Sequence, residues 1–146
     1  MSRLASIPIS AEPIGSTPEA WDNSLPILHE IRHGLKRLAE TDESTVIDLN
    51  AIPFGPNDEA RLLELLGKGE VKAEVDALGP TRVWESAVHG VWIIDHRNLE
   101  EQRLALHIEI TKIPDILRTQ SQDIIEALRA FEARIATGPG EPDPTS

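Results

Sequence analysis

The spacing of apolar residues changes along the chain between a helical and an alternating period, and each change marks a predicted element. The first helical stretch begins at Asn23 or Ser24, either of which can cap it, and Pro26 falls in the first turn, where no hydrogen bond is lost. Its apolar stripe comprises Leu25, Leu28, Ile31, Leu35 and Leu38. This pattern predicts an amphipathic helix with one side against the core.

A short strand and a short helix are predicted next. The run 45–49 is the strand, and the proline and glycine residues that follow break the extended segment. Asp58 can cap a short helix whose leucines extend to residue 66, and Gly67 ends this helix.

The following segment has a period of two, which is typical of strands buried on one face. In residues 70–77, valine and alanine alternate with lysine, glutamate and aspartate, which predicts one buried and one charged face. Further strands are predicted over 82–88 and 91–96, separated by a turn at His89 and Gly90. Residues 91–96 are apolar on both faces, so we expect this strand at the centre of the sheet.

The last strand and the last helix are the most regular of the predicted elements. The strand points Leu104, Leu106, Ile108 and Ile110 inward and His107 and Glu109 outward. Pro114 ends this strand, and Ser121 can cap the helix that follows. The apolar stripe of that helix comprises Ile124, Ile125, Leu128, Phe131 and Ile135.

The order of these elements predicts an α+β fold. Strands that follow one another and are flanked by helices favour a mainly antiparallel sheet of about four to five strands, with helices packed on one face. We expect residues 1–22 to form an extended, mobile segment, residues 23–136 a single α+β domain, and residues 137–146, which are rich in proline and glycine, a disordered tail. A cytoplasmic location is the default expectation, because no apolar run suits a signal peptide or a membrane helix.

Composition removes several classes of chemistry. The 146 residues include no cysteine, which excludes disulfides, thiolate zinc sites and iron–sulfur ligation by cysteine. The formal net charge of −11 argues against a general affinity for nucleic acid or for an anionic membrane, and it suits a basic protein partner. No cofactor is expected from these features.

A zinc-protease motif is present in the first predicted helix. His29, Glu30 and His33 match the pattern His-Glu-x-x-His, in which two histidines one turn apart chelate zinc and the glutamate activates a water molecule. At about 100° per residue, however, both histidines lie roughly 120–170° from the centre of the apolar stripe. No third ligand follows at a recognisable offset. We therefore reject a metal site here, and a small zinc-dependent hydrolase is kept only as the alternative function.

Two features are candidates for binding a partner. Trp84 and Trp92 fall on neighbouring predicted strands and can be cross-strand neighbours, either as core residues or as part of an interface. Asp95, His96, Arg97 and Asn98 form the densest polar cluster, which is either a hairpin end or a specific polar contact.

An ordered set of short segments resembles a known family. These segments are LHEIRH (28–33) with Leu35, IDL (47–49), LELLG (63–67), GEV (69–71), GVW (90–92), HRN (96–98), IEI (108–110) and IPDIL (113–117). In this order, over about residues 25–128, they are similar to the HupH/HyaF-type hydrogenase expression/formation family. In that family the His-Glu-x-x-His string is incidental to the helix pattern.

The resemblance implies an accessory, chaperone-like protein in NiFe-hydrogenase maturation, with no catalytic residues. Such proteins act on the hydrogenase small-subunit precursor, together with other hydrogenase accessory proteins, before export and assembly. Family members often hold two related modules in a longer chain, and this chain accounts for a single C-terminal-type module. A homodimer is therefore a further expectation.

Overall fold

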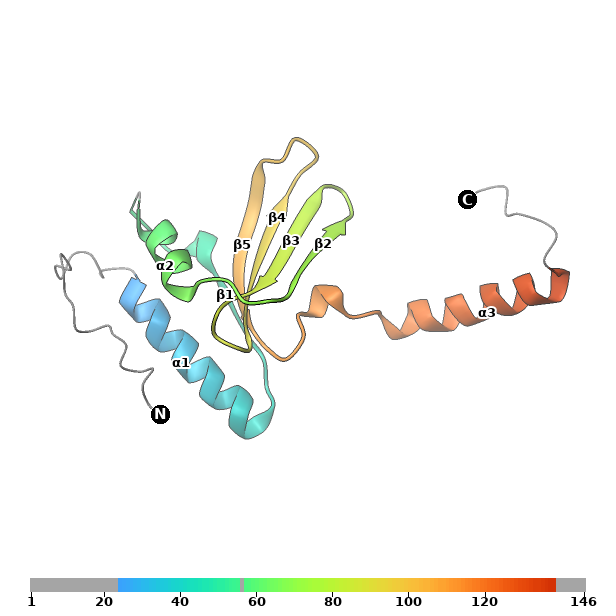
Figure 1. The fold of residues 1–146 in the computed structure, drawn as a ribbon, viewed down its shortest axis with the longest axis horizontal. Coiled ribbons are helices and arrows are strands. Elements are labelled where there is room, and N and C mark those ends of the chain that lie inside the picture. Colours follow the sequence, from blue (N-terminus) through green and yellow to red (C-terminus); the bar gives the residue numbers. More distant parts are fainter. Residues whose placement is uncertain (1–23, 56, 139–146) are drawn as a thin grey trace. The chain divides into compact units, whose positions relative to one another are not determined.

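The computed structural model describes residues 24–55 and 57–138. In chain order its elements are α1 (Ser24–Thr41), β1 (Thr45–Asp48), the 3-10 helix η3 (Leu49–Ala51), α2 (Asp58–Leu66), β2 (Lys72–Asp76), β3 (Pro80–Glu85), β4 (Val91–Arg97), β5 (Arg103–Ile110), the 3-10 helix η4 (Asp115–Leu117) and α3 (Ser121–Thr137) (Figure 1). The chain divides into two compact units, with the boundary after Pro114. Residues 1–22 and most of 137–146 lie outside the described residues, so their predicted character stays a prediction, as does the single domain over 23–136.

The first unit contains one antiparallel sheet. Its five strands lie in the order β1-β5-β4-β3-β2, and every neighbouring pair is antiparallel. β4 is the middle strand, and its first five residues are all buried, which confirms the central place predicted for the strand that is apolar on both faces. The α+β fold class is also confirmed.

The two faces of the sheet follow from the strand register, because directly opposite residues share a face. Trp84 lies opposite Ile93, and Ile93 lies opposite Ile108. These residues belong to the face that packs against α1 and α2, which we call the helix-covered face (Figure 1). Trp92 and Ile94 point to the other side, which we call the opposite face.

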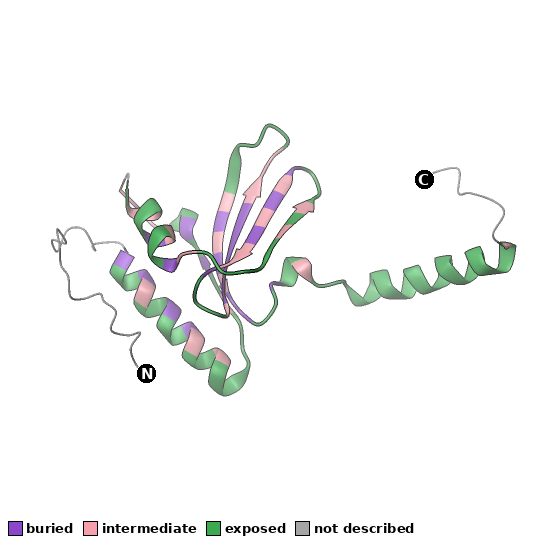
Figure 2. Ribbon diagram, in the orientation of Figure 1, coloured by how far each residue is buried: buried purple, intermediate pink, exposed green. Residues whose placement is uncertain are grey.

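The core lies between the helix-covered face and the two helices. Its buried members are Ile27, Ile31, Ile47, Leu49, Leu62, Leu66, Val91, Ile93, Leu106, Ile108 and Ile110. Figure 2 shows buried positions as bands along α1, at α2 and along the strands. A Cβ atom at Gly34 would lie 2.7 Å from Cδ1 of Ile110, so glycine at this position lets α1 approach the sheet closely.

The structure differs from the predicted pattern in α1. Ile27 and Gly34 are buried, whereas Leu25 is 45% exposed and Leu28 and Leu35 are only partly buried. The side of α1 that packs against the sheet is therefore not centred on the predicted stripe. It is shifted towards Ile27 and Gly34, and Gly34 permits the closest approach to the sheet.

Two strand predictions are wrong in detail. Leu104 is 58% exposed, because the register shifts between His96 and Arg97 and Leu104 is the residue of β5 that this irregularity leaves without an opposite partner. β3 ends at Glu85 rather than at Val88. There the Ser86 hydroxyl accepts a hydrogen bond from the Val88 amide at 3.0 Å and starts the turn earlier than predicted.

The second unit contains α3, whose amphipathic pattern was predicted. Its N-cap is Gln120, without a side-chain hydrogen bond, so Ser121 is the first helical residue and not the cap. The apolar stripe predicted for α3 is exposed. Across the described part of the chain, no helix combines the length and the apolar character needed to cross a membrane.

Candidate partner-binding site

The predicted partner-binding residues do not form one patch, because consecutive residues of a strand point to opposite faces. Asp95 and Arg97 lie on the helix-covered face, as does Trp84. Trp92 and His96 lie on the opposite face. The structure therefore divides these candidates into two groups on two surfaces.

Trp84 and Trp92 are not cross-strand neighbours. Trp84 pairs with Ile93, and Trp92 pairs with Glu85, so the two indoles are offset by one position and lie on different faces. Trp92 is 6% exposed, and its Nε1 donates a hydrogen bond to the Thr111 carbonyl at 3.1 Å. Trp92 thus fixes the segment after β5 and offers little surface to a partner.

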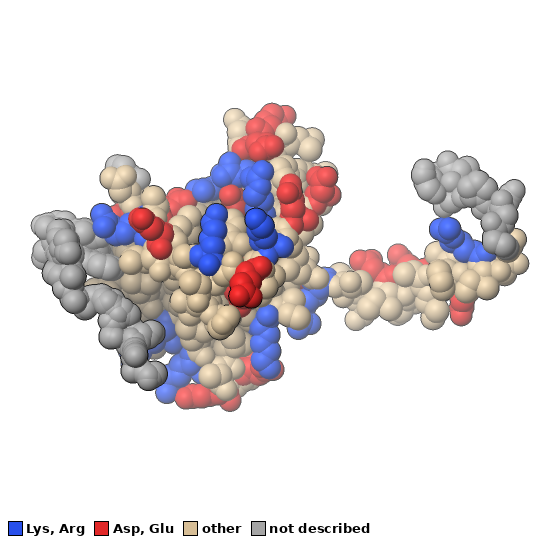
Figure 3. Space-filling view, viewed as in Figure 1, with Lys and Arg blue, Asp and Glu red and all other residues tan. Residues whose placement is uncertain are grey.

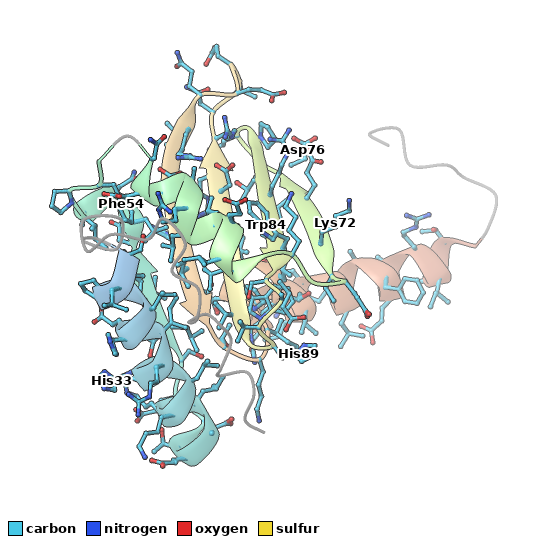
Figure 4. The ribbon with its side chains drawn as sticks, turned by 60° about the vertical axis from the view of Figure 1, so that its left-hand side comes forward. His33, Phe54, Lys72, Asp76, Trp84 and His89 are labelled. Carbon is cyan, nitrogen blue, oxygen red and sulfur yellow. The ribbon has the colours of Figure 1, made fainter. Side chains whose placement is uncertain are left out.

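Trp84 has a different environment. It is partly buried and packs against the core, and the Lys68 ammonium lies 5.3 Å from its ring centroid in a cation–π contact. Lys72 lies directly opposite it on β2, as Figure 4 shows (Figure 4). Trp84 is the tryptophan that remains accessible among the described residues.

Asp95 is the buried centre of a partly exposed ion-pair network. It is 5% exposed, and its Oδ2 accepts hydrogen bonds from Nε and Nη2 of Arg97 at 3.2 and 3.0 Å. Nε of Arg103 lies 3.6 Å from Oδ1, and Arg103 also pairs with Glu59 of α2. The network joins β4, β5 and α2. Asp95 therefore stabilises the fold, and its burial leaves it little access to a partner.

Asn98 organises the hairpin between β4 and β5. Its Oδ1 accepts hydrogen bonds from the Glu100 amide at 3.0 Å and from the Gln102 amide at 2.9 Å. The backbone amide of Asn98 donates a hydrogen bond to the Gln102 carbonyl at 3.0 Å. The hairpin-end interpretation therefore accounts for Asn98.

His96 and His107 meet on the opposite face of the sheet. Their ring centroids are 5.5 Å apart in an edge-on arrangement, and Nδ1 of His96 lies 3.3 Å from the Thr81 hydroxyl. Nε2 of His107 is 3.7 Å from Oδ1 of Asp48. Burial lowers the pKa of His96 below its ordinary value of 6.5; a charged His107 lowers it further, and Asp95 opposes the shift.

This environment predicts a pH-dependent loss of stability. Because the pKa of His96 is lower in the folded than in the unfolded chain, the unfolded chain takes up the proton first. The stability contributed by neutral His96 is complete above about pH 6.5 and declines as the pH falls towards the folded-state value. We expect His96→Gln to lose less free energy of unfolding than the unmodified protein between about pH 7.5 and 5.5.

Urea denaturation at the two pH values measures this difference. His33→Gln on the exposed side of α1 is the matched control, and it should keep the pH dependence of the unmodified protein. Equal pH dependence in His96→Gln and the unmodified protein would show that His96 carries none of the effect.

The zinc-motif residues occupy the side of α1 that was predicted. His29, Glu30 and His33 are all exposed, whereas the buried positions of α1 lie on its other side, which confirms the argument from helical facing. Within residues 24–55 and 57–138, no group of three or more His, Asp or Glu side chains is placed to hold a metal ion.

One surface groove was not predicted from the sequence. A groove of about 470 Å³ lies on the helix-covered face beside Trp84, and the charged residues that line it are Lys68, Lys72, Glu74 and Arg82. The pairing of β2 with β3 brings Lys72, Glu74 and Arg82 together, and Lys68 joins them through its contact with the Trp84 ring. The strand register places the basic residue Lys72 opposite Trp84, and the sequence alone does not specify this register.

Residues 22–137 match a family model described as the C-terminal conserved region of the HupH hydrogenase expression protein. Among curated proteins, the hydrogenase expression/formation protein HoxQ of Azotobacter vinelandii is 30% identical over 113 residues, which is 76% of this chain and 40% of HoxQ. HupQ of Azotobacter chroococcum is 31% identical over 114 residues, again 76% of this chain and 40% of the relative.

A solved structure is similar over most of the fold. The hydrogenase expression protein HupH from Thiobacillus denitrificans matches with a TM-score of 0.76 and 37% sequence identity, covering 79% of this chain and 96% of that one. By contrast, the chain spans about 40% of the length of the curated relatives that it matches.

Proposed function

Because the chain belongs to the HupH family of hydrogenase expression proteins, we propose that it acts as an accessory protein in NiFe-hydrogenase maturation and binds a protein client. The observation that carries this proposal is the family match over residues 22–137, which includes every described element of the fold. The client would be the hydrogenase small-subunit precursor or another maturation factor, bound in the cytoplasm before export and assembly.

The chemistry of the chain supports a binding role rather than catalysis. The conspicuous polar residues at the end of β4 are engaged in structure, with Asp95 in ion pairs and Asn98 in the hairpin. The chain has no cysteine, so it would handle the precursor of a metalloprotein without serving as a conventional carrier of iron–sulfur clusters.

The net charge suggests how a client is attracted. With a formal charge of −11, the chain would speed association with a basic segment, for which the twin-arginine signal of a small-subunit precursor is our candidate. Such long-range attraction acts over about 8–10 Å at ordinary ionic strength and is screened by added salt.

We expect capture of the small-subunit precursor by the full chain to weaken above roughly 0.3 M salt, where the screening length is only a few ångströms. Pull-downs at low and high salt, with the precursor and with a form that lacks its signal peptide, measure the effect. The precursor of an unrelated protein with a twin-arginine signal is the matched control for client identity.

Each result is informative. Capture that is insensitive to salt and to removal of the signal peptide would overturn the electrostatic mechanism. If no hydrogenase precursor or hydrogenase accessory protein co-purified with the tagged chain from its native host, the accessory role itself would be wrong.

A further inference from the structure

The groove beside Trp84 is basic although the chain as a whole is acidic. Lys68, Lys72 and Arg82 line it, and Glu74 is the acidic residue among its lining side chains. Figure 3 shows several Lys and Arg side chains in the middle of this view, with acidic side chains beside them and along the upper margin (Figure 3). The local charge is therefore opposite in sign to the net charge of −11.

The cations in the groove differ in how far they are engaged. Arg82 pairs with Glu101 at 3.5 Å, and Lys68 lies over the Trp84 ring. Lys72 is exposed, and the ion pairs described for residues 24–55 and 57–138 do not include it. A partner can therefore pair with Lys72 without breaking an existing contact.

The groove continues into a free sheet edge. β2 is the last strand of the sheet, and within the described residues no strand pairs with its outer side. The Glu85 amide donates to the Val71 carbonyl at 2.9 Å, and hydrogen-bonded pairs alternate along an antiparallel ladder. The backbone N–H and C=O groups of Lys72 and Glu74 therefore point away from β3, towards solvent.

We propose that this groove and the adjoining edge of β2 bind an extended, acidic segment of a partner protein. An extended segment can pair its backbone with the edge of β2, and its alternate side chains then lie on the helix-covered face beside Lys72. Acidic side chains there would meet Lys72 and Lys68, and an apolar side chain two residues along the segment, on the same face, would cover the exposed part of Trp84.

Charge complementarity decides between possible occupants. A basic segment would place its cations next to Lys68, Lys72 and Arg82, so the groove disfavours the kind of segment that the proposed function attributes to a precursor signal. Glu74 and Asp76 project from β2 on the same face and would repel the continuous phosphate backbone of a nucleic acid. The surface thus goes beyond the proposed function, because it serves a second recognition step of opposite charge.

The acidic residues of β2 also predict the polarity of the bound segment. Lys72 is at one end of β2 and Asp76 at the other. The acidic side chains of the partner should therefore lie at the Lys72 end, and polar or apolar residues should lie at the Asp76 end.

A phage-displayed library of random dodecapeptides, selected on the full chain, tests the proposal. We expect the selected peptides to carry acidic residues at alternate positions at one end and polar or apolar residues at the other. A fluorescein-labelled peptide made from their consensus should bind with an affinity, measured by fluorescence anisotropy, that falls about tenfold or more in Lys72→Glu, since charge reversal turns attraction into repulsion.

The controls separate local from general charge effects. Lys36→Glu makes the same change in net charge on α1, at a side chain that is 69% exposed, and it should bind the peptide like the unmodified protein. Trp84→Leu keeps an apolar side chain against the core, and we expect it to weaken peptide binding. Circular dichroism checks that this variant folds. Lys72→Glu tests the groove without changing a core residue.

Several results would overturn the proposal. They are the selection of no peptides, the selection of peptides without an acidic excess, and equal binding by Lys72→Glu and Lys36→Glu. Tight binding of a fluorescein-labelled single-stranded oligonucleotide that is lost in Lys72→Glu would reassign the groove to nucleic acid and would overturn it as well.

Discussion

Replacing Asp95 with alanine is expected to lower the free energy of unfolding by about 3 kcal/mol, the lower end of the range for removing one partner of a buried ion pair. Asp95 is 5% exposed, and its carboxylate contacts both Arg97 and Arg103. Without it, Arg97 loses the carboxylate with which it pairs, and Arg103 keeps only its ion pair with Glu59. The side chains of Arg97 and Arg103 are 26% and 34% exposed, so partial hydration keeps the loss from being larger.

The network also joins elements that are far apart in the sequence. Arg103 of β5 pairs both with Asp95 of β4 and with Glu59 of α2. Oδ1 of Asp95 is buried without a hydrogen bond, so its interaction with Arg103 is electrostatic. We therefore expect Asp95→Asn, which keeps the shape but not the charge, to be destabilised almost as much as the alanine variant.

Urea denaturation at neutral pH measures these losses. Glu40→Ala is the matched control, because it breaks the ion pair of Glu40 with Lys36 at a side chain that is 60% exposed, and it should cost no more than about 0.5 kcal/mol. A double-mutant cycle of Asp95→Ala with Arg97→Ala should reveal a favourable coupling energy. A loss below about 1 kcal/mol in Asp95→Ala would show that the buried network is balanced by its desolvation cost.

The sequence was sufficient to predict the elements of the fold. The helical period identified α1, α2 and α3, and the apolar run of β4 identified the middle strand, because burial on both faces requires neighbours on both sides. These are local properties of the chain, and the spacing of its apolar residues is enough to predict them. The side of α1 that meets the sheet was harder to predict, since the close approach at Gly34 depends on Ile110, which is remote in sequence.

The register between strands was outside the reach of sequence reasoning. Trp84 and Trp92 fall on different faces because of a one-residue offset in the pairing of β3 with β4. No local pattern specifies this offset, because β4 is buried on both faces and tolerates either alignment. The polar run from Asp95 to Asn98, predicted as one cluster, is divided by the sheet for a different reason: consecutive residues of a strand point to opposite faces.

The net charge gave only an average over the whole chain. It correctly describes a predominance of acidic residues, but it hides the basic groove that β2 and β3 create beside Trp84. If both proposals hold, the chain presents acidic surfaces to one segment and a basic groove to another. The two recognition steps would then differ in the charge of the partner while sharing a dependence on salt.

Gly79→Ala is expected to destabilise the fold by about 3 kcal/mol or more, through backbone strain and steric overlap acting together. Gly79 lies in the turn that joins β2 to β3. Its φ is +130°, a backbone conformation that residues other than glycine rarely adopt. An added Cβ would lie 2.3 Å from the Arg97 carbonyl oxygen and 2.6 Å from the Asn98 carbonyl carbon. Both are backbone atoms, so the overlap cannot be relieved by turning a side chain.

Gly90→Ala separates the two causes. Gly90 also has a positive φ, +89°, but a Cβ there would lie 3.6 Å from Leu35 Cδ2, an ordinary contact, so we expect a loss of only about 1 kcal/mol from backbone strain. Urea denaturation of both variants measures the difference. If the two alanine variants lost equal stability, the close approach of Gly79 to the end of β4 would contribute nothing, and the strain of the turn alone would explain the glycine.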